Sequence, residues 1–115
     1  MNLVKITVVK RLDLREIHAE TDLGCSSSAT PVCERFEEGQ EFVTDLVTVP
    51  DGFCPFAFVD ISRYASGLRA GADYPWMNEA GTVLACCTDG FRPVVFRLER
   101  IPGAYEMKQG CFGGL

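Results

Sequence analysis

Cysteine is the residue type that gives this chain most of its chemical options. The sequence has six cysteines among 115 residues: Cys25, Cys33, Cys54, Cys86, Cys87 and Cys111. An even number in a short chain is compatible with a disulfide framework. The first residues, MNLVKITVVKRLDL, lack the apolar stretch and cleavage site of a secretory signal. We therefore expect a cytoplasmic protein, in which free thiols, a metal site or redox chemistry are favoured.

A metal site would have to be assembled from cysteines that lie far apart in the sequence. Neither CxxC nor HxxxH is present, so no single turn supplies two ligands of a tetrahedral site. The candidate ligands are Cys33, Cys54 and one of Cys86 or Cys87, with His18 as a further one. Such a set would hold zinc or an iron–sulfur cluster. The alternative is that these cysteines are packing residues of a structural protein without a site.

Cys54 directly precedes Pro55, where a long helix is predicted to begin. Its sulfur would lie near unpaired N–H groups and the positive end of the helix dipole, which is a common setting for a reactive cysteine. The other interpretation is a small buried residue that fills space at a strand-to-helix turn.

Arg92 is the basis of a second hypothesis, a binding module or enzyme for a small anionic metabolite. Thr88, Asp89 and Arg92 follow the paired cysteines, and with Trp76 and the start of the long helix they could hold a carboxylate. Asp89 also stands in an Asp-Gly turn, where it has a local structural role. The chain has one histidine and lacks the GxSxG, P-loop and GxGxxG patterns, so hydrolytic catalysis is not indicated.

An α+β fold with a mixed or antiparallel sheet of about four strands is predicted to position these residues. Alternating apolar positions indicate strands near residues 3–11, 41–47, 82–88 and 94–101. An apolar stripe of helical period indicates one long helix over residues 55–70. A short helix is predicted after Asp13, with Leu14 and Ile17 on its inner face.

The strands at 82–88 and 94–101 are predicted to form a hairpin around the Asp89-Gly90 turn. Successive side chains on a strand point to opposite faces of the sheet. Only one of Cys86 and Cys87 can therefore face a given pocket.

Length and charge limit the function classes. A chain of this length is expected to form a single domain over residues 1–115. The net charge of −5 does not suit a nucleic-acid partner, and no long apolar run predicts a membrane span. Four strands leave sheet edges to be covered, so we expect a homo-oligomer.

Four segments carry a resemblance to a known family: KITVVKR, CERFEEGQEFV, PDGFCPFAFVDISRYASGLRAG and ACCTDGFRPVVFRLERI. They resemble a family of small bacterial proteins, found often in anaerobes, for which no activity is established. The resemblance covers residues 4–101 and leaves residues 102–115 as a C-terminal extension.

The resemblance implies a set of positions that matter: Cys33, Gly39, Phe42, Cys54, Cys87, Thr88, Asp89, Gly90, Arg92 and Pro93. Cys25 and Cys111 lie outside it. The family pattern selects Cys87 as the functional cysteine and leaves Cys86 as the packing residue on the other face. The resulting expectation is a small thiol protein that binds a metal or redox centre through Cys33, Cys54 and Cys87, as an accessory in anaerobic metabolism.

Overall fold

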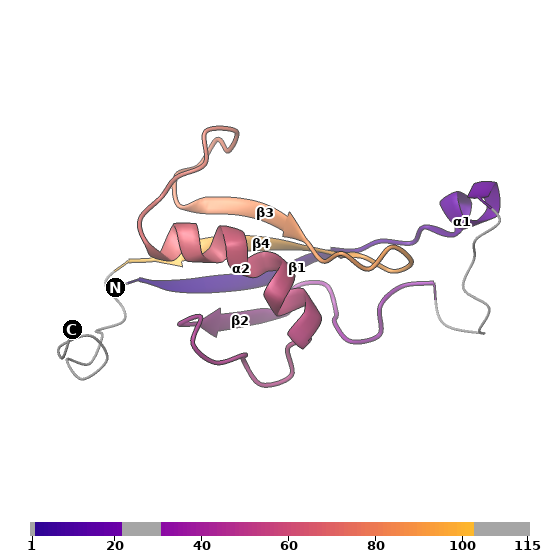
Figure 1. Cartoon of the computed structure of the whole chain (residues 1–115), viewed down its shortest axis with the longest axis horizontal. Coiled ribbons are helices and arrows are strands. Elements are labelled where there is room, and N and C mark those ends of the chain that lie inside the picture. The colour runs from indigo at the N-terminus through magenta and orange to yellow at the C-terminus, as the bar shows by residue number, and fades with distance from the viewer. Residues whose placement is uncertain (1, 22–30, 103–115) are drawn as a thin grey trace.

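A four-stranded antiparallel sheet with one long helix across one face forms the body of the protein, which confirms the predicted α+β class (Figure 1). The computed structural model describes residues 2–21 and 31–102. Its elements are β1 (Leu3–Arg11), α1 (Arg15–Thr21), β2 (Glu41–Thr44), α2 (Pro55–Arg69), β3 (Thr82–Cys86) and β4 (Val94–Ile101).

The strands lie in the order β2-β1-β4-β3, and every neighbouring pair is antiparallel. The inner strand β1 buries Val4, Ile6 and Val8, while the residues between them face the open side of the sheet. This alternation is the period of a strand with one covered face. The predicted hairpin is present, because β3 pairs with β4 from Thr82 opposite Glu99 to Cys86 opposite Val95.

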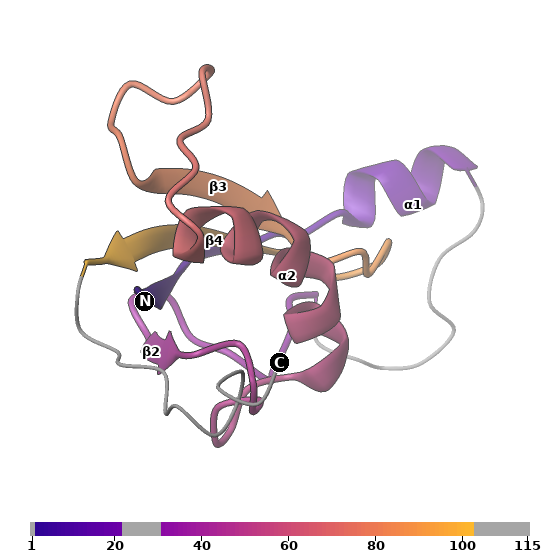
Figure 2. The ribbon, with the colours of Figure 1, turned by 60° about the vertical axis from the view of Figure 1, so that its left-hand side comes forward.

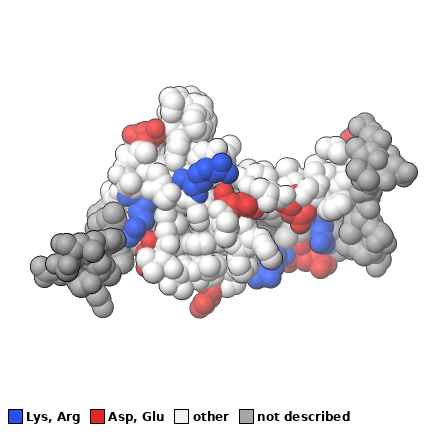
Figure 3. All heavy atoms as spheres, in the orientation of Figure 1, with Lys and Arg blue, Asp and Glu red and all other residues white. Residues whose placement is uncertain are grey.

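Helix α2 covers the sheet with four fully buried residues: Ala57, Ile61, Ala65 and Leu68. They recur at helical spacing and form the apolar stripe that the sequence predicts. Pro55 occupies the start of the helix, where its missing N–H removes no helical hydrogen bond. Uncharged side chains dominate the surface on the α2 side, with charged groups scattered among them (Figure 3). None of the described helices has the length and apolarity needed to cross a membrane.

Three phenylalanine rings from segments far apart in the sequence pack against one another in the core. The ring centroids of Phe36 and Phe53 are 5.1 Å apart, and Phe96 of β4 lies 5.3 Å from Phe36 and 5.5 Å from Phe53. All three side chains are buried. Phe36 lies three residues after Cys33, and Phe53 directly precedes Cys54. This cluster therefore positions two of the candidate cysteines.

The structure corrects three details of the predicted elements. Strand β2 ends at Thr44 rather than at residue 47, because Leu46 adopts a left-handed φ of 67° and its N–H donates to Thr44 Oγ1 (2.9 Å). Strand β3 ends at Cys86 rather than at residue 88, and the N–H of Thr88 donates to Asp60 (2.8 Å). Helix α1 stands away from α2 and the sheet (Figure 2), and Ile17 is exposed rather than facing inward.

Candidate functional site

A pocket of about 280 Å³ opens at the N-terminal end of α2. Three cysteines line it from three separate segments: Cys33 before the aromatic cluster, Cys54 at the helix start and Cys87 after β3. The other lining residues are Phe36, Phe56, Ala57, Asp60, Thr88, Asp89, Arg92 and Val94. The pocket thus brings together most of the candidates that the sequence indicates.

Each of the three cysteines is half-buried and held by its own neighbours. Arg11 Nη1 donates to the backbone oxygen of Cys33 (3.2 Å), and Cys54 is the N-cap residue of α2. The sulfur of Cys87 accepts a hydrogen bond from the N–H of Val94 (3.2 Å). This hydrogen bond fixes the position of the Cys87 sulfur at the wall of the pocket.

The first turn of α2 contributes unpaired donors to the pocket. The Cys54 side chain does not cap the helix, and Pro55 has no N–H. The N–H groups of Phe56 and Ala57 consequently have no acceptor within the helix. Together with the helix dipole they place partial positive charge at this end of the pocket.

Both carboxylates of the pocket accept hydrogen bonds from backbone N–H groups of the segment that follows Cys87. Asp60 accepts the N–H of Thr88 (2.8 Å) and, at 3.0 and 3.1 Å, its hydroxyl. Asp89 Oδ1 accepts the N–H groups of Phe91 (2.8 Å) and Arg92 (3.2 Å), which closes the turn. Asp60 thereby ties the segment that follows Cys87 to α2.

Arg92 is the cationic side chain of the pocket. It is half-buried, and within residues 2–21 and 31–102 its guanidinium makes no hydrogen bond or ion pair. Other arginines behave differently: Arg11, Arg97 and Arg100 are each paired with a carboxylate at 2.8 to 3.0 Å. Arg92 is thus the charged group left to meet a ligand.

The thiols share the pocket without forming a metal coordination sphere. No group of three or more histidine, cysteine, aspartate or glutamate side chains in the described part of the chain is arranged to hold a metal ion. His18, a predicted further ligand, lies instead at the hairpin turn, where its ring packs on Phe91 at 4.9 Å and its Nε2 is 3.4 Å from the oxygen of Gly90. A metal would require the cysteine side chains to turn toward one another.

Cys86 lies on the opposite side of the strand from Cys87, as the alternation predicts, but it is exposed rather than packed. Partial desolvation, with smaller contributions from Cys87 and Asp60, raises the pKa of its thiol. Its expected role as a packing residue is therefore wrong. Cys25 and Cys111 lie outside the described residues.

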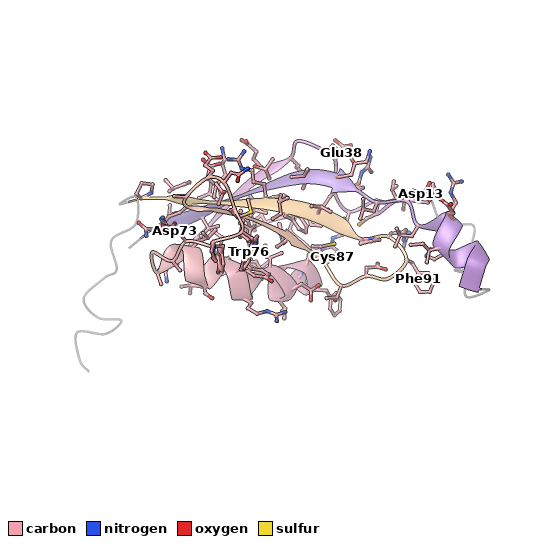
Figure 4. The ribbon with its side chains drawn as sticks, turned by 90° about the horizontal axis from the view of Figure 1, so that it is seen from above. Asp13, Glu38, Asp73, Trp76, Cys87 and Phe91 are labelled. Carbon is pink, nitrogen blue, oxygen red and sulfur yellow. The ribbon has the colours of Figure 1, made fainter. Side chains whose placement is uncertain are left out.

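Trp76 also lies outside the pocket, contrary to its predicted place beside Arg92. Its ring packs 5.1 Å from Tyr74 and 6.3 Å from Tyr64, near the other end of α2. Figure 4 shows Trp76 and Asp73 toward the C-terminal end of the helix and Cys87 at its N-terminal end. Trp76 lines a different groove with Met77 and Leu84.

Asp60 and Phe56 are pocket residues that the sequence did not single out. A signal was present, because Phe56 and Asp60 are four residues apart and so lie on the same side of α2 at its N-terminal end. That spacing cannot say which loop the side chains meet.

Glu38 fixes the segment that carries Cys33 to the end of β1. It accepts the backbone N–H of Arg11 (2.8 Å) and pairs with the guanidinium (3.0 Å). These hydrogen bonds lower the pKa of Glu38 from 4.5 to about 2. A lowered pKa in the folded state stabilises the fold above the unfolded pKa, and this contribution disappears as the pH falls through the folded value.

We therefore expect Glu38→Gln to destabilise the protein at pH 7, by an amount that shrinks as the pH falls from about 4.5 to about 2. Urea denaturation at several pH values measures the difference between the two proteins. Glu34→Gln removes an exposed carboxylate of the same segment that pairs with no arginine within residues 2–21 and 31–102, and it is expected to destabilise the protein less at pH 7. A difference for Glu38→Gln that is constant with pH would contradict the assignment.

Comparisons of the chain with family models, with curated proteins and with solved structures found no match. The family resemblance of its four segments stays a prediction.

Proposed function

We propose that the pocket at the start of α2 binds a small organic anion. The observation that carries this proposal is the Arg92 guanidinium, which is unpaired among the described residues and lines a pocket beside the free N–H groups of Phe56 and Ala57. An arginine and a helix N-terminus are both favourable partners for a carboxylate or another oxyanion.

The lining of the pocket narrows the class of ligand. Phe36, Phe56 and Val94 provide apolar walls, which suit an apolar body. Asp60 and Asp89 add negative charge to the same pocket, so a ligand with several charges would be repelled. These features together favour a monocarboxylate with a small apolar body.

A thermal-shift panel tests this proposal. Butyrate and benzoate are expected to raise the melting temperature, while butyramide, benzamide and citrate are not. A ligand at 100 times its dissociation constant would stabilise the protein by about 2.7 kcal/mol. Arg92→Ala is expected to lower the affinity roughly 10- to 100-fold, because a charge-assisted hydrogen bond contributes about 1.5–3 kcal/mol.

The matched control is Arg63→Ala, which removes an exposed arginine of α2 that does not line the pocket and should leave the stabilisation unchanged. Full ligand stabilisation in Arg92→Ala would rule out this role for Arg92. A panel in which no monocarboxylate stabilises the wild-type protein would sink the proposal as a whole.

A second candidate function is a thiolate site for a soft metal centre, either zinc or an iron–sulfur cluster. What supports it is that Cys33, Cys54 and Cys87 line one pocket although they are far apart in the sequence. Cys54 comes 21 positions after Cys33, and Cys87 comes 33 positions after Cys54. The N–H group that Val94 donates to the Cys87 sulfur is a second support, because such bonds tune thiolate ligands of metal centres. In this alternative Arg92 would offset the negative charge of a three-thiolate site.

A further inference from the structure

The pocket at the start of α2 combines positive charge with thiol side chains. Arg92 and the free N–H groups of the first helical turn form its positive part, and Cys33, Cys54 and Cys87 line the same cavity. All three cysteines are free thiols. A thiol is a nucleophile, so it can form a covalent bond with a ligand that carries a leaving group. The pocket therefore places nucleophiles beside a site for a carboxylate.

The small volume of the pocket brings a bound ligand close to these thiols. At about 280 Å³ it lies just below the roughly 300–1,000 Å³ that is typical of ligand pockets. A monocarboxylate whose charged end meets Arg92 therefore has its carbon chain against the remaining walls, which the cysteines help to form. Holding two reacting groups together in this way converts a bimolecular encounter into a much faster unimolecular step.

Cys54 is the pocket thiol that lies closest along the chain to the anion-binding end of α2. It is the N-cap residue, two positions before Phe56, whose N–H has no acceptor within the helix. The Cys54 side chain makes no capping hydrogen bond, whereas the Cys87 sulfur accepts the N–H of Val94 (3.2 Å). Of these two thiols, Cys54 is the one left to meet a carbon atom next to the bound carboxylate.

We propose that Cys54 is a modification site for small electrophilic monocarboxylates, those with a leaving group on the carbon next to the carboxylate. This inference rests on the proposed function, since the anion site holds the substrate by its carboxylate. The Cys54 sulfur attacks that carbon and forms a C–S bond. The bond to the leaving group breaks, the leaving group departs with the electron pair, and the thiol proton passes to water. The product is a carboxyalkyl thioether.

Charge compensation gives the pocket a selectivity that an exposed thiol lacks. A carboxylate beside the reacting carbon repels an attacking thiolate, because the two charges have the same sign. In the pocket Arg92 and the positive end of α2 compensate the charge of the carboxylate. Cys86 is exposed and lies outside the pocket, so it lacks this compensation. We therefore expect Cys54 to prefer an anionic reagent and Cys86 to prefer a neutral one.

Alkylation of the reduced, metal-free full chain by iodoacetate and by iodoacetamide tests the proposal. The two reagents share the iodide leaving group and differ in charge. Peptide mass spectrometry follows each cysteine separately and gives the ratio of the iodoacetate rate to the iodoacetamide rate. This ratio is expected to exceed one at Cys54 and to lie below one at Cys86. Butyrate is expected to slow the reaction of Cys54 with iodoacetate and to leave that of Cys86 unchanged.

Arg92→Ala is expected to lower the rate ratio at Cys54 about tenfold or more, because it removes a charge-assisted hydrogen bond to the carboxylate. The control is Arg63→Ala, which removes an exposed arginine of α2 outside the pocket and should keep the ratio of the wild type.

A ratio at Cys54 no higher than that at Cys86 would overturn the inference. A preference for iodoacetate that appears at Cys33 or Cys87 instead, or that Arg92→Ala leaves unchanged, would overturn it as well. The thermal-shift panel separates this failure from that of the proposed function. Stabilisation by butyrate without selective alkylation removes the inference alone, whereas a panel in which no monocarboxylate stabilises the protein removes both.

Discussion

Phe96→Ala is expected to lower the free energy of unfolding by about 3–5 kcal/mol. Phe96 is fully buried on β4, one of the two inner strands of the sheet, and its ring contacts both Phe36 and Phe53. Truncation removes apolar burial and leaves a cavity beside the rings of Phe36 and Phe53. Urea denaturation followed by circular dichroism measures the change.

The size of this effect matters because a small domain has about 5–15 kcal/mol of stability in total. Phe91→Ala is the matched control: its ring lies at the hairpin turn and is 41% exposed, so a loss below about 1 kcal/mol is expected. The cluster also positions Cys33 and Cys54, so Phe96→Ala should make both thiols react faster with a thiol reagent. Equal destabilisation by the two variants would show that the cluster is not the centre of the core.

Local patterns predicted the parts of the fold in which side chains alternate or recur. Val4, Ile6 and Val8 reveal the buried face of β1, and the stripe from Ala57 to Leu68 reveals the inner side of α2. The end of β2 could not be found in this way, because the left-handed turn at Leu46 depends on a hydrogen bond to Thr44 that has no periodic signal. For Ile17 a local apolar spacing was present, but α1 stands away from the sheet (Figure 2), and Ile17 is exposed.

The candidate site was predictable to the extent that strand alternation and helix starts determine it. Alternation separates Cys86 from Cys87, and Pro55 places Cys54 at the end of a helix; both features are present. The position of Trp76 was not predictable, because a loop of mixed composition carries no register that relates it to α2. The hydrogen bond between Asp60 and Thr88 was not predicted either, because no local pattern relates residues that are 28 apart in the sequence.

A titration with cobalt(II) distinguishes the metal centre from the anion site, and Cys87→Ser is the variant with the largest expected effect. If the three pocket thiols are ligands, reduced wild-type protein should bind one ion and develop thiolate charge-transfer absorption. Cys87→Ser should lower the affinity roughly 100-fold or more, since loss of residues that only support metal ligands already lowers it by about 10–100-fold. Cobalt(II) reports tetrahedral thiolate sites that zinc would occupy.

Cys86→Ser is the control that the strand itself supplies. It changes the neighbouring residue in the same way, but on the exposed face of β3, away from the pocket. Its affinity for cobalt should match that of the wild type. Equal losses in the two variants would mean that the metal binds elsewhere or that the strand is disturbed. Absence of thiolate absorption from the wild-type protein would eliminate the metal candidate, while leaving the Arg92-dependent anion site to be decided by its own ligand panel.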